Sequence, residues 1–325
     1  MDAATLEHLF RQALAARLES PPFMLPPVRH LRGIVIPAGG DLYNRLAWHL
    51  IHALRGLACR LPIQVWHLPS EASIAWTQLY AAEGVEIIDA GVVAKNLGVP
   101  VPMGGWQLKP FALRHCDISE AMLLDADNVP ARDPTYLFND TGYERHGAMF
   151  WPDLPPPRSR GQWVPAAAWA NVGLEQDHAA RPFESGQILV NRKRCLAALD
   201  VAVFLNEWSD YVYEWVYGDK DTFLLAWHLL GQRYHMPPRN PIFRHPAICQ
   251  HDSKGELVFQ HATAGKEGLA AGEIFHALLN RRFSPDAAAD LGPKMGAILA
   301  GTGAKPASTR KSESVEPNVA SEATP

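Results

Sequence analysis

Hydrophobic and polar positions along this chain alternate between the period of a strand and that of a helix. The apolar run from Gly33 to Gly40 predicts a strand that ends in a glycine turn. Residues 44–58 follow, with leucines at the spacing of one helix face. The same patterns predict further strands at 63–68, 85–89, 120–125, 186–192 and 256–262, and further helices at 73–83, 108–116, 195–217, 219–230 and 272–281. Strands that alternate with helices predict an α/β protein with a mainly parallel sheet.

The two ends and the middle of the chain depart from this alternation. Residues 1–20 form an amphipathic pattern, and a proline-rich connector follows, so residues 1–29 are predicted to precede a main domain at 30–285. Residues 140–185 are rich in proline and tryptophan and are predicted to be mostly loop, which in a compact domain indicates a functional or mobile segment. Residues 300–325 carry few large apolar side chains, which predicts a disordered tail.

The most informative segment is the strand predicted at 120–125, because it ends in two aspartates. Asp125 and Asp127 are spaced i, i+2, so they share one face of the sheet if the extended geometry persists. Pro130 then stops the strand. Neighbouring carboxylates repel each other unless a cation lies beside them, and a hard divalent cation that carries diphosphate oxygens is the natural candidate. The alternative is that Asp125 ends the strand and Asp127 caps the turn.

Other residues fall at positions where a ligand would bind such a sheet. Ligands of open α/β sheets bind outside the carboxyl ends of the strands, and both the aspartates and the pair Gly39–Gly40 lie at such ends. Lys109 lies near the start of the helix that precedes the aspartate strand, where a positive charge suits phosphate. A solvated surface lysine is the alternative.

Two further acidic segments are candidates for contact with a sugar. Asp219 and Asp221 open a predicted helix, so one could face a reacting sugar while the other caps the helix, or both could be caps. We expect Asp221 to have the larger catalytic effect. Glu184 lies just before Gly186, which permits a close approach of the backbone, and its side chain could contact the sugar.

A late histidine and lysine complete the candidate site. His261 ends the strand at 256–262, and Lys266 follows five residues later. Imidazole is a good ligand for Mn²⁺ and a poorer one for Mg²⁺. A metal ion and a lysine together can neutralise a diphosphate leaving group.

Composition narrows the class of protein. The 325 residues are 47% hydrophobic and 20% charged, which allows a substantial core. The net charge of −4 gives no electrostatic reason to expect nucleic acid. No signal-type or membrane-spanning apolar run is found, so we expect a protein of the cytoplasm, with or without peripheral attachment to a membrane. The four scattered cysteines predict reduced, buried thiols.

Taken in order, these segments resemble the fungal-type α-1,3-mannosyltransferase family (glycosyltransferase family 71), within the GT-A nucleotide-diphospho-sugar transferases. The resemblance covers roughly residues 30–265. The resembling segments lie at 33–40, 105–113, 124–138, 150–153, 184–187, 218–225 and 259–261.

The resemblance implies a GT-A-like fold, with a mixed, mainly parallel sheet flanked by helices. It also implies a retaining transferase that uses a nucleotide-diphosphate hexose, mannose favoured, and a divalent metal, Mn²⁺ favoured over Mg²⁺. The acceptor would be a glycan or another hydroxyl compound. The implied metal ligands are Asp125, Asp127 and His261; the implied donor-binding residues are Gly39, Gly40, Lys109, Asp125 and Lys266; and the implied catalytic residues are Asp219, Asp221 and Glu184.

Two other functions fit the same residues. A nucleotidyltransferase or phosphohydrolase also uses paired aspartates with a metal, and a catalytically degenerate transferase fold could simply bind glycans. Within the transferase hypothesis, the segment at 150–185 is the candidate for acceptor binding, because aromatic faces pack on sugar rings. Its Trp163 and Trp169 could instead belong to the core.

Overall fold

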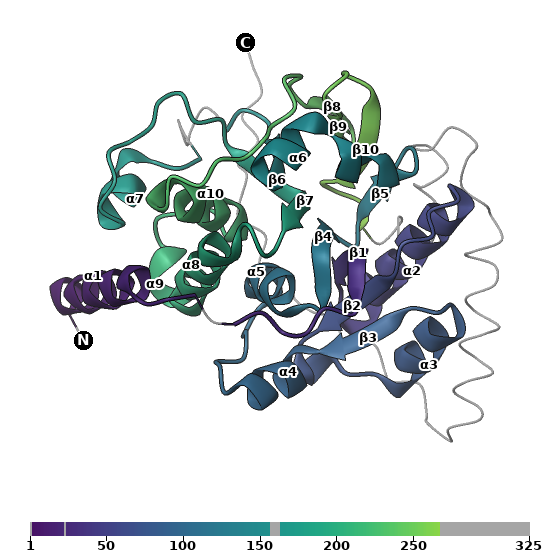
Figure 1. Cartoon of the computed structure of the whole chain (residues 1–325), viewed down its shortest axis with the longest axis horizontal. Helices are drawn as coiled ribbons and strands as arrows, with labels where there is room; N and C mark the ends of the chain where they lie inside the picture. The colour runs from purple at the N-terminus through teal and green to yellow at the C-terminus, as the bar shows by residue number, and fades with distance from the viewer. Residues whose placement is uncertain (1, 23, 157–162, 267–325) are drawn as a thin grey trace, which may run out of the picture.

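A six-stranded sheet forms the centre of the computed structural model, which describes residues 2–22, 24–156 and 163–266 (Figure 1). The strand order is β3-β2-β1-β4-β7-β6. The first four of these strands run parallel to one another, whereas β7 is antiparallel to both β4 and β6. The strands are β1 (His30–Pro37), β2 (Ile63–His67), β3 (Glu86–Asp89), β4 (Ile118–Leu124), β6 (Ala148–Pro152) and β7 (Phe183–Asn191). The predicted α/β class with a mixed, mainly parallel sheet is confirmed.

Both faces of this sheet are buried, because alternate residues of its central strands enter two separate cores. In β1, Val35 points into one core while Ile34 and Ile36 point into the other. In β4, Leu123 and Leu124 divide in the same way. A strand that is covered on both sides must be apolar at every position, which is why these segments are continuous apolar runs in the sequence.

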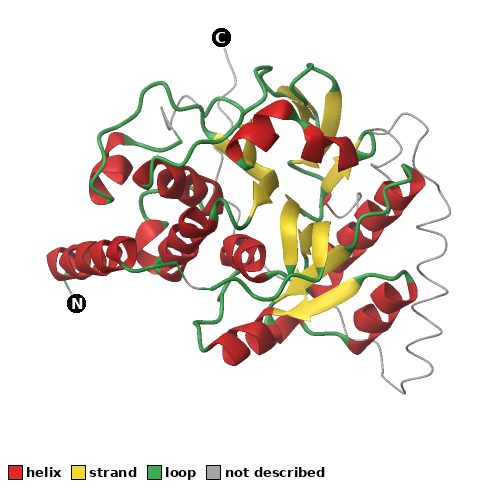
Figure 2. Ribbon diagram, in the orientation of Figure 1, coloured by secondary structure: helices red, strands yellow, loops and turns green. Residues whose placement is uncertain are grey.

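Helices cover both faces of the sheet, as the secondary-structure view makes plain (Figure 2). The first core is formed with α1, α4, α5, α7, α8 and α10, and the second with α2 and α3. The helices are α1 (Ala3–Glu19), α2 (Gly40–Gly56), α3 (Ile74–Ala82), α4 (Ala90–Leu97), α5 (Gly105–His115), α6 (Thr141–His146), α7 (Ala166–Asn171), α8 (Leu196–Glu207), α9 (Ser209–Val212) and α10 (Asp219–Leu229), with short 3-10 turns η1 (Pro69–Glu71) and η2 (Pro134–Asn139).

A second, antiparallel sheet positions the late histidine. Its strand order is β5-β10-β9-β8, and the sequence predicted only one of these strands. Pairing of β10 with β5 places His261 opposite Asn128, which is the residue that follows Asp127. The strands are β5 (Asn128–Pro130), β8 (Ile242–Arg244), β9 (Ala247–His251) and β10 (Leu257–Ala262).

The N-terminal helix packs on the main domain rather than standing apart from it. The Phe10 ring lies 6.1 Å from Phe204 and 5.2 Å from Tyr211, so α1 buries its apolar face against α8 and α9. No helix in the described part of the chain is sufficiently long and apolar to span a membrane. All four cysteines are buried free thiols, as predicted.

Several sequence-based boundaries were wrong. The segment at 140–185 is rich in loop, as predicted, but it also contains α6, β6, α7 and the start of β7, which the sequence did not predict. Its strand β6 is short and contains Pro152, which weakened the strand pattern. The helix predicted at 195–217 is divided into α8 and α9. The helix at 272–281, the end of the domain at 285 and the tail at 300–325 lie outside the described residues.

Candidate active site

The two aspartates lie in a turn that links the two sheets. Strand β4 ends at Leu124, and the backbone N–H of Asn128 donates to the carbonyl of Asp125 at 2.9 Å. The extended geometry therefore does not persist beyond Leu124, so the condition under which both aspartates would share one face of the strand is not met. The turn is needed because the chain enters the second sheet at β5. It nevertheless brings both carboxylates to the same imidazole.

That imidazole belongs to His261. Its Nε2 atom lies 3.6 Å from Oδ2 of Asp125 and 3.2 Å from Oδ1 of Asp127. One potential ligand atom from each of these three residues lies within 4.8 Å of the others, which suits a single metal ion. Two carboxylates and an imidazole form a donor set that favours Mn²⁺ over Mg²⁺. We call Asp125, Asp127 and His261 the metal triad.

Another group of possible ligands among the described residues has a different explanation. His30, Glu86 and Asp117 also lie within 4.8 Å of one another. However, the guanidinium of Arg29 bonds to both carboxylates, 2.7 Å from Glu86 and in direct contact with Asp117. This group also lies at the amino ends of β1, β3 and β4, whereas open α/β sheets bind ligands outside the carboxyl ends, so the metal triad is the candidate metal site.

Glu184 holds the histidine from behind. Its Oε1 atom lies 2.9 Å from His261 Nδ1 and accepts the backbone N–H of Gly186 at 2.7 Å. Its other oxygen accepts from the side chain of Gln187. A carboxylate on the far nitrogen of a metal-binding histidine fixes the orientation of the ring and raises its basicity. This geometry supports a positioning role for Glu184 rather than the direct sugar contact expected from the sequence.

Gly186 is required where the histidine ring crosses β7. A Cβ atom at this position would lie 2.4 Å from His261 Nδ1, closer than real Cβ contacts. The glycine in Glu184-Ser185-Gly186-Gln187 therefore permits a close approach, as the sequence indicated. What approaches is a side chain from the second sheet.

Lys109 lies inside the cluster instead of on the surface. It is buried in the second turn of α5, and its ammonium group lies 2.7 Å from Asp125, 3.3 Å from the hydroxyl of Ser185 and 3.5 Å from Asp219. Burial lowers the pKa of Lys109, but Asp125 and Asp219 outweigh it, so the pKa is raised above its ordinary value. Lys109 is therefore a fixed positive charge.

Lys266 supplies a second positive charge on the other side of the metal triad. Its ammonium group lies 2.8 Å from Oδ2 of Asp127, which is almost wholly buried. Burial raises the pKa of Asp127, but His261 and Lys266 outweigh it and hold the pKa well below its usual value. Burial raises the pKa of Asp125 to about 6 in spite of the opposing effect of Lys109. The two carboxylates thus differ in how strongly the protein holds them ionised.

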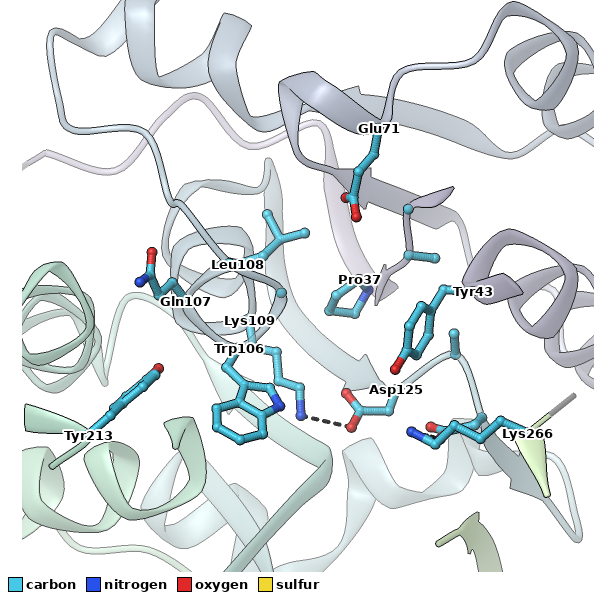
Figure 3. A pocket seen from close by; sticks show the side chains of 16 residues that line it. Pro37, Tyr43, Glu71, Trp106, Gln107, Leu108, Lys109, Asp125, Tyr213 and Lys266 are labelled. Carbon is cyan, nitrogen blue, oxygen red and sulfur yellow. Dashed lines mark hydrogen bonds and ion pairs between the residues drawn. The ribbon is translucent and has the colours of Figure 1, made fainter. Parts of the chain in front are cut away.

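The cluster opens into a cavity of about 410 Å³, shown from close by in Figure 3. Lys109, Asp125, Asp127 and Lys266 line its floor, while His261, Glu184 and Asp219 lie behind this lining. Gly39 lines the cavity and precedes α2, and a Cβ atom there would lie 1.9 Å from an oxygen of Glu71.

Gly40 differs from its neighbour Gly39. It has φ of +63°, a backbone conformation that glycine adopts without steric cost, and a Cβ atom there would meet no atom within 4 Å. Its role in the structure is therefore to start α2, and it lies outside the cavity lining.

The two aspartates at the start of α10 have separate surroundings. Asp219 pairs with Lys109 and so belongs to the cluster. Asp221 is fully buried and accepts the backbone N–H of Tyr217 at 2.7 Å, which is a structural contact that closes the turn before the helix. Burial raises the pKa of Asp221 to about 7. Asp219 thus lies within the charged cluster, whereas the contact of Asp221 is to the backbone.

Sequence reasoning missed the walls of the cavity. Tyr43 and Glu71 lie at one end and Trp106 and Tyr213 at the other. Trp106 lies in the resembling segment at 105–113, but the other three lie in no segment that the sequence singled out, and their place in the cavity wall depends on how the elements pack. Of the two tryptophans suggested for acceptor binding, Trp169 is buried in the core, as the alternative proposed, and Trp163 packs partly against the same core.

Comparisons with known proteins show similarity to mannosyltransferases. The sequence matches the family described as "Mannosyltransferase putative" over residues 31–172 and 164–244. It is 26% identical to the α-1,2-mannosyltransferase MNN21 of Candida albicans, over 62% of this chain and 38% of that protein. It is 25% identical to the α-1,2-mannosyltransferase MNN5 of Saccharomyces cerevisiae, over 70% of this chain and 48% of that protein. The chain thus spans less than half the length of these two curated relatives.

Solved glycosyltransferase structures show a weaker likeness. The galactosyltransferase LgtC, in complex with donor and acceptor sugar analogues, has a TM-score of 0.43 and 18% identity, over 59% of this chain and 69% of that one. The mannosyltransferase Ktr4p of S. cerevisiae has a TM-score of 0.38 and 10% identity, over 70% of this chain and 76% of that one.

The curated relatives also correct one detail of the resemblance. They are named as α-1,2-mannosyltransferases, whereas the sequence resemblance was to an α-1,3 family. The family match itself includes the segments that carry the aspartate turn, Lys109, Glu184 and Asp219, and it extends over more than half of the chain. The chain therefore belongs to this mannosyltransferase family.

Proposed function

We propose that the protein transfers mannose from a nucleotide-diphosphate sugar to a hydroxyl group of a glycan, with a divalent metal ion and with retention of configuration. The observation that carries this proposal is the metal triad between two lysines at the floor of a cavity. A diphosphate needs several positive charges around it, and a metal ion with Lys109 and Lys266 would provide them.

The residues present fit a divalent metal ion. The triad offers two carboxylates and an imidazole from a buried turn and a neighbouring strand, and Glu184 orients the imidazole. Without a metal ion, Glu184 and Asp127 raise the pKa of His261 well above its usual value even though burial lowers it. The carboxylates therefore already stabilise a positive charge at this position. A bound Mn²⁺ would act as a Lewis acid on the diphosphate oxygens.

The other residues of the cluster have separable roles in transfer. The bond from the anomeric carbon to the diphosphate breaks, a bond to the acceptor oxygen forms, and the proton of the acceptor hydroxyl leaves with the nucleoside diphosphate. Lys266, which is only partly buried, would approach the leaving diphosphate. Lys109 and Asp219 would lie beside the sugar, where Asp219 opposes the positive charge that develops on the anomeric carbon.

The linkage that best fits the relatives is α-1,2. The curated relatives are named as α-1,2-mannosyltransferases. The expectation of an α-1,3 linkage came from the sequence resemblance alone. We therefore propose attachment of mannose to a 2-hydroxyl group.

A transfer assay with product analysis tests the proposal. The purified chain would be incubated with nucleoside-diphosphate mannose, Mn²⁺ and α-linked mannobiose, and the product sized and its linkage determined. We expect a mannotriose that forms only with the metal, and a rise in melting temperature with donor and metal together, because a ligand that binds the folded state stabilises it. Absence of both would refute the proposal.

The same assay separates the two rival functions. A phosphohydrolase would cleave the donor with water to nucleoside monophosphate and free mannose-1-phosphate. A nucleotidyltransferase would do so only with added pyrophosphate, which takes the nucleotidyl group as nucleoside triphosphate, and neither enzyme would extend the acceptor. A degenerate glycan-binding protein would bind mannobiose but would turn over no donor. The intact metal triad and its two lysines argue against a pure binder, because a protein that only holds glycans has no use for a diphosphate site.

A further inference from the structure

The cavity has an end that the proposed metal and diphosphate contacts leave unused. Trp106 and Tyr213 line this end, and Tyr43 and Glu71 line the opposite one, with the Lys109–Asp125 pair between them (Figure 3). Trp106 is 49% exposed. An exposed indole at the mouth of a polar cavity is unusual for a residue whose only role is packing, because its apolar surface would be better buried.

Trp106 belongs to a continuous series of aromatic rings. Its centroid lies 5.8 Å from that of Tyr213 and 5.9 Å from that of Tyr217. The Tyr217 ring, itself 44% exposed, lies 5.3 Å from Trp163. These are the distances of interacting aromatic pairs. We call Tyr213, Trp106, Tyr217 and Trp163 the aromatic row.

The backbone and polar groups behind the row hold its first rings in place. The hydroxyl of Tyr213 donates to the buried side chain of Asn206, which in turn bonds to Thr222. Trp106 lies against Gly218, where a Cβ atom would be only 2.7 Å from the indole. Gly218 also has φ of +73°, so any other residue would be strained there as well. The indole is therefore fixed although half of it is exposed.

Lys220 supports the outer rings. Its ammonium group lies 3.4 Å from the centroid of Trp163 and 5.1 Å from that of Tyr217. It also forms a buried ion pair with Asp153. A cation over two ring faces restricts how both rings can turn. The row is thus a rigid aromatic surface, which loses little entropy when a ligand binds to it.

We propose that the aromatic row is the acceptor subsite and binds a mannose-based oligosaccharide, with one hexose ring stacked on Trp106. This inference rests on the proposed transferase function. A pyranose ring has an apolar face of C–H groups and a polar rim of hydroxyls, which matches an exposed aromatic face beside charged groups. A nucleotide base at the same end would also stack, so the position along the cavity has to decide between them.

Position favours the acceptor. The metal triad and Lys266 fix the diphosphate, and Lys266 lies 5.3 Å from the ring of Tyr43, at the end opposite the row. A nucleoside attached to that diphosphate therefore extends toward Tyr43 and Glu71. The sugar then lies near Lys109 and the acceptor beyond it, on the side of Trp106. An acceptor stacked on the row is consequently held within reach of the anomeric carbon.

Separate measurements of acceptor and donor binding test this assignment. In Trp106→Ala, we expect the KM for α-linked mannotriose to rise about 10-fold, the loss that follows removal of one aromatic stacking contact. Trp106→Phe should retain most of the acceptor binding. The affinity of both variants for nucleoside-diphosphate mannose with Mn²⁺, measured without acceptor, should equal that of the wild type.

Two matched variants complete the experiment. Phe243 on β8 is 51% exposed, almost as much as Trp106, and lies outside the cavity lining, so Phe243→Ala should leave both affinities unchanged. Tyr43→Ala should show the reverse pattern, with weaker donor binding and an unchanged KM for mannotriose.

The outcomes separate this inference from the proposed function. Wild-type protein that binds no nucleoside-diphosphate mannose refutes the function, and the inference with it. Wild-type protein that binds the donor but not mannotriose overturns the inference alone. The inference also fails if Trp106→Ala weakens donor binding as much as acceptor binding, or if it leaves the KM for mannotriose unchanged.

Discussion

The floor of the cavity and its aromatic end are built by opposite means. The floor gathers charges from distant segments, with Lys109 on α5, Asp125 and Asp127 in a turn and His261 on β10, and each charge is held by a partner of opposite sign. The aromatic end combines Trp106 of α5 and Trp163 before α7 with two tyrosines between α9 and α10, and it depends mainly on contacts between rings, supported by Lys220. The floor is suited to a charged diphosphate and the aromatic end to a neutral sugar.

The two regions should therefore respond differently to mutation. A charge removed from the floor leaves a buried partner uncompensated, which is costly in the ground state and more so when negative charge develops on the diphosphate. A ring removed from the aromatic end loses contact area alone. Changes in the floor should consequently reduce turnover, and changes at the aromatic end should weaken acceptor binding.

The largest effect is expected for Asp127→Ala. Asp127 contacts both His261 and Lys266, so its loss opens the metal triad and releases the lysine together. Turnover should fall by about 1000-fold, at the upper end of what removal of one preorganised electrostatic group causes. Donor affinity should lose its dependence on Mn²⁺. Both are measured by transfer kinetics and calorimetric titration.

Asp252→Asn is the control for this variant, because Asp252 is equally buried but accepts hydrogen bonds in the second sheet, far along the chain from the aspartate turn. Its kinetics should match those of the wild type. If Asp127→Ala is folded and still binds the donor with metal as tightly as wild type, the metal triad has been misassigned.

The next effect separates the two aspartates of α10. Asp219→Asn retains size but removes the charge that faces Lys109, so turnover should fall by about 100-fold. Asp221→Asn keeps an acceptor for the Tyr217 N–H, and its turnover should stay within about 2-fold of wild type, since its contact is structural. Single-turnover kinetics would measure both. The opposite order would return the catalytic role to Asp221.

These contrasts also show how much the sequence could predict. The charged floor of the cavity could be predicted, because Asp125, Asp127 and Lys109 are polar residues at the ends of apolar segments. This pattern is visible in the sequence itself. The approach of His261 to the aspartates depends on the pairing of β5 with β10. These two strands are more than 120 residues apart in the sequence. The resemblance supplied that association, and periodicity alone would not have.

The aromatic end of the cavity could not be predicted from the sequence, for a different reason. Trp106 and Tyr213 are of residue types that are usually found in the core. Their position at the cavity follows from how α5 and α9 pack. The sequence also could not predict the different surroundings of Asp219 and Asp221, because both positions suit a helix start equally well. Only the distances to Lys109 and to the Tyr217 backbone distinguish them.

A smaller effect tests the fit between the two sheets. Gly186→Ala places a methyl group where the His261 ring lies, so the ring must shift while every ligand is still present. Metal affinity should weaken by about 10-fold, as when the support of a ligand is disturbed. Titration with Mn²⁺ measures this. The control is Gly56→Ala, since a Cβ atom there meets nothing within 4 Å. Equal affinities in both variants would show that the ring position is unimportant.

The smallest effect concerns stability and not catalysis. Burial raises the pKa of Asp221 from 3.8 to about 7, against the lowering effect of Lys220. Between these values the folded protein holds a proton that the unfolded chain releases, so this group makes the free energy of unfolding fall as pH rises from about 4 to 7 and adds no further change above 7. Asn does not titrate. The difference in melting temperature, Asp221→Asn minus wild type, should therefore increase by a few degrees as the pH is raised from 5 to 8. Scanning calorimetry at intervals of half a pH unit measures this difference. Parallel curves of melting temperature against pH for the two proteins would show that Asp221 is ionised throughout. Lys220 and the Tyr217 N–H would then be sufficient to stabilise its charge.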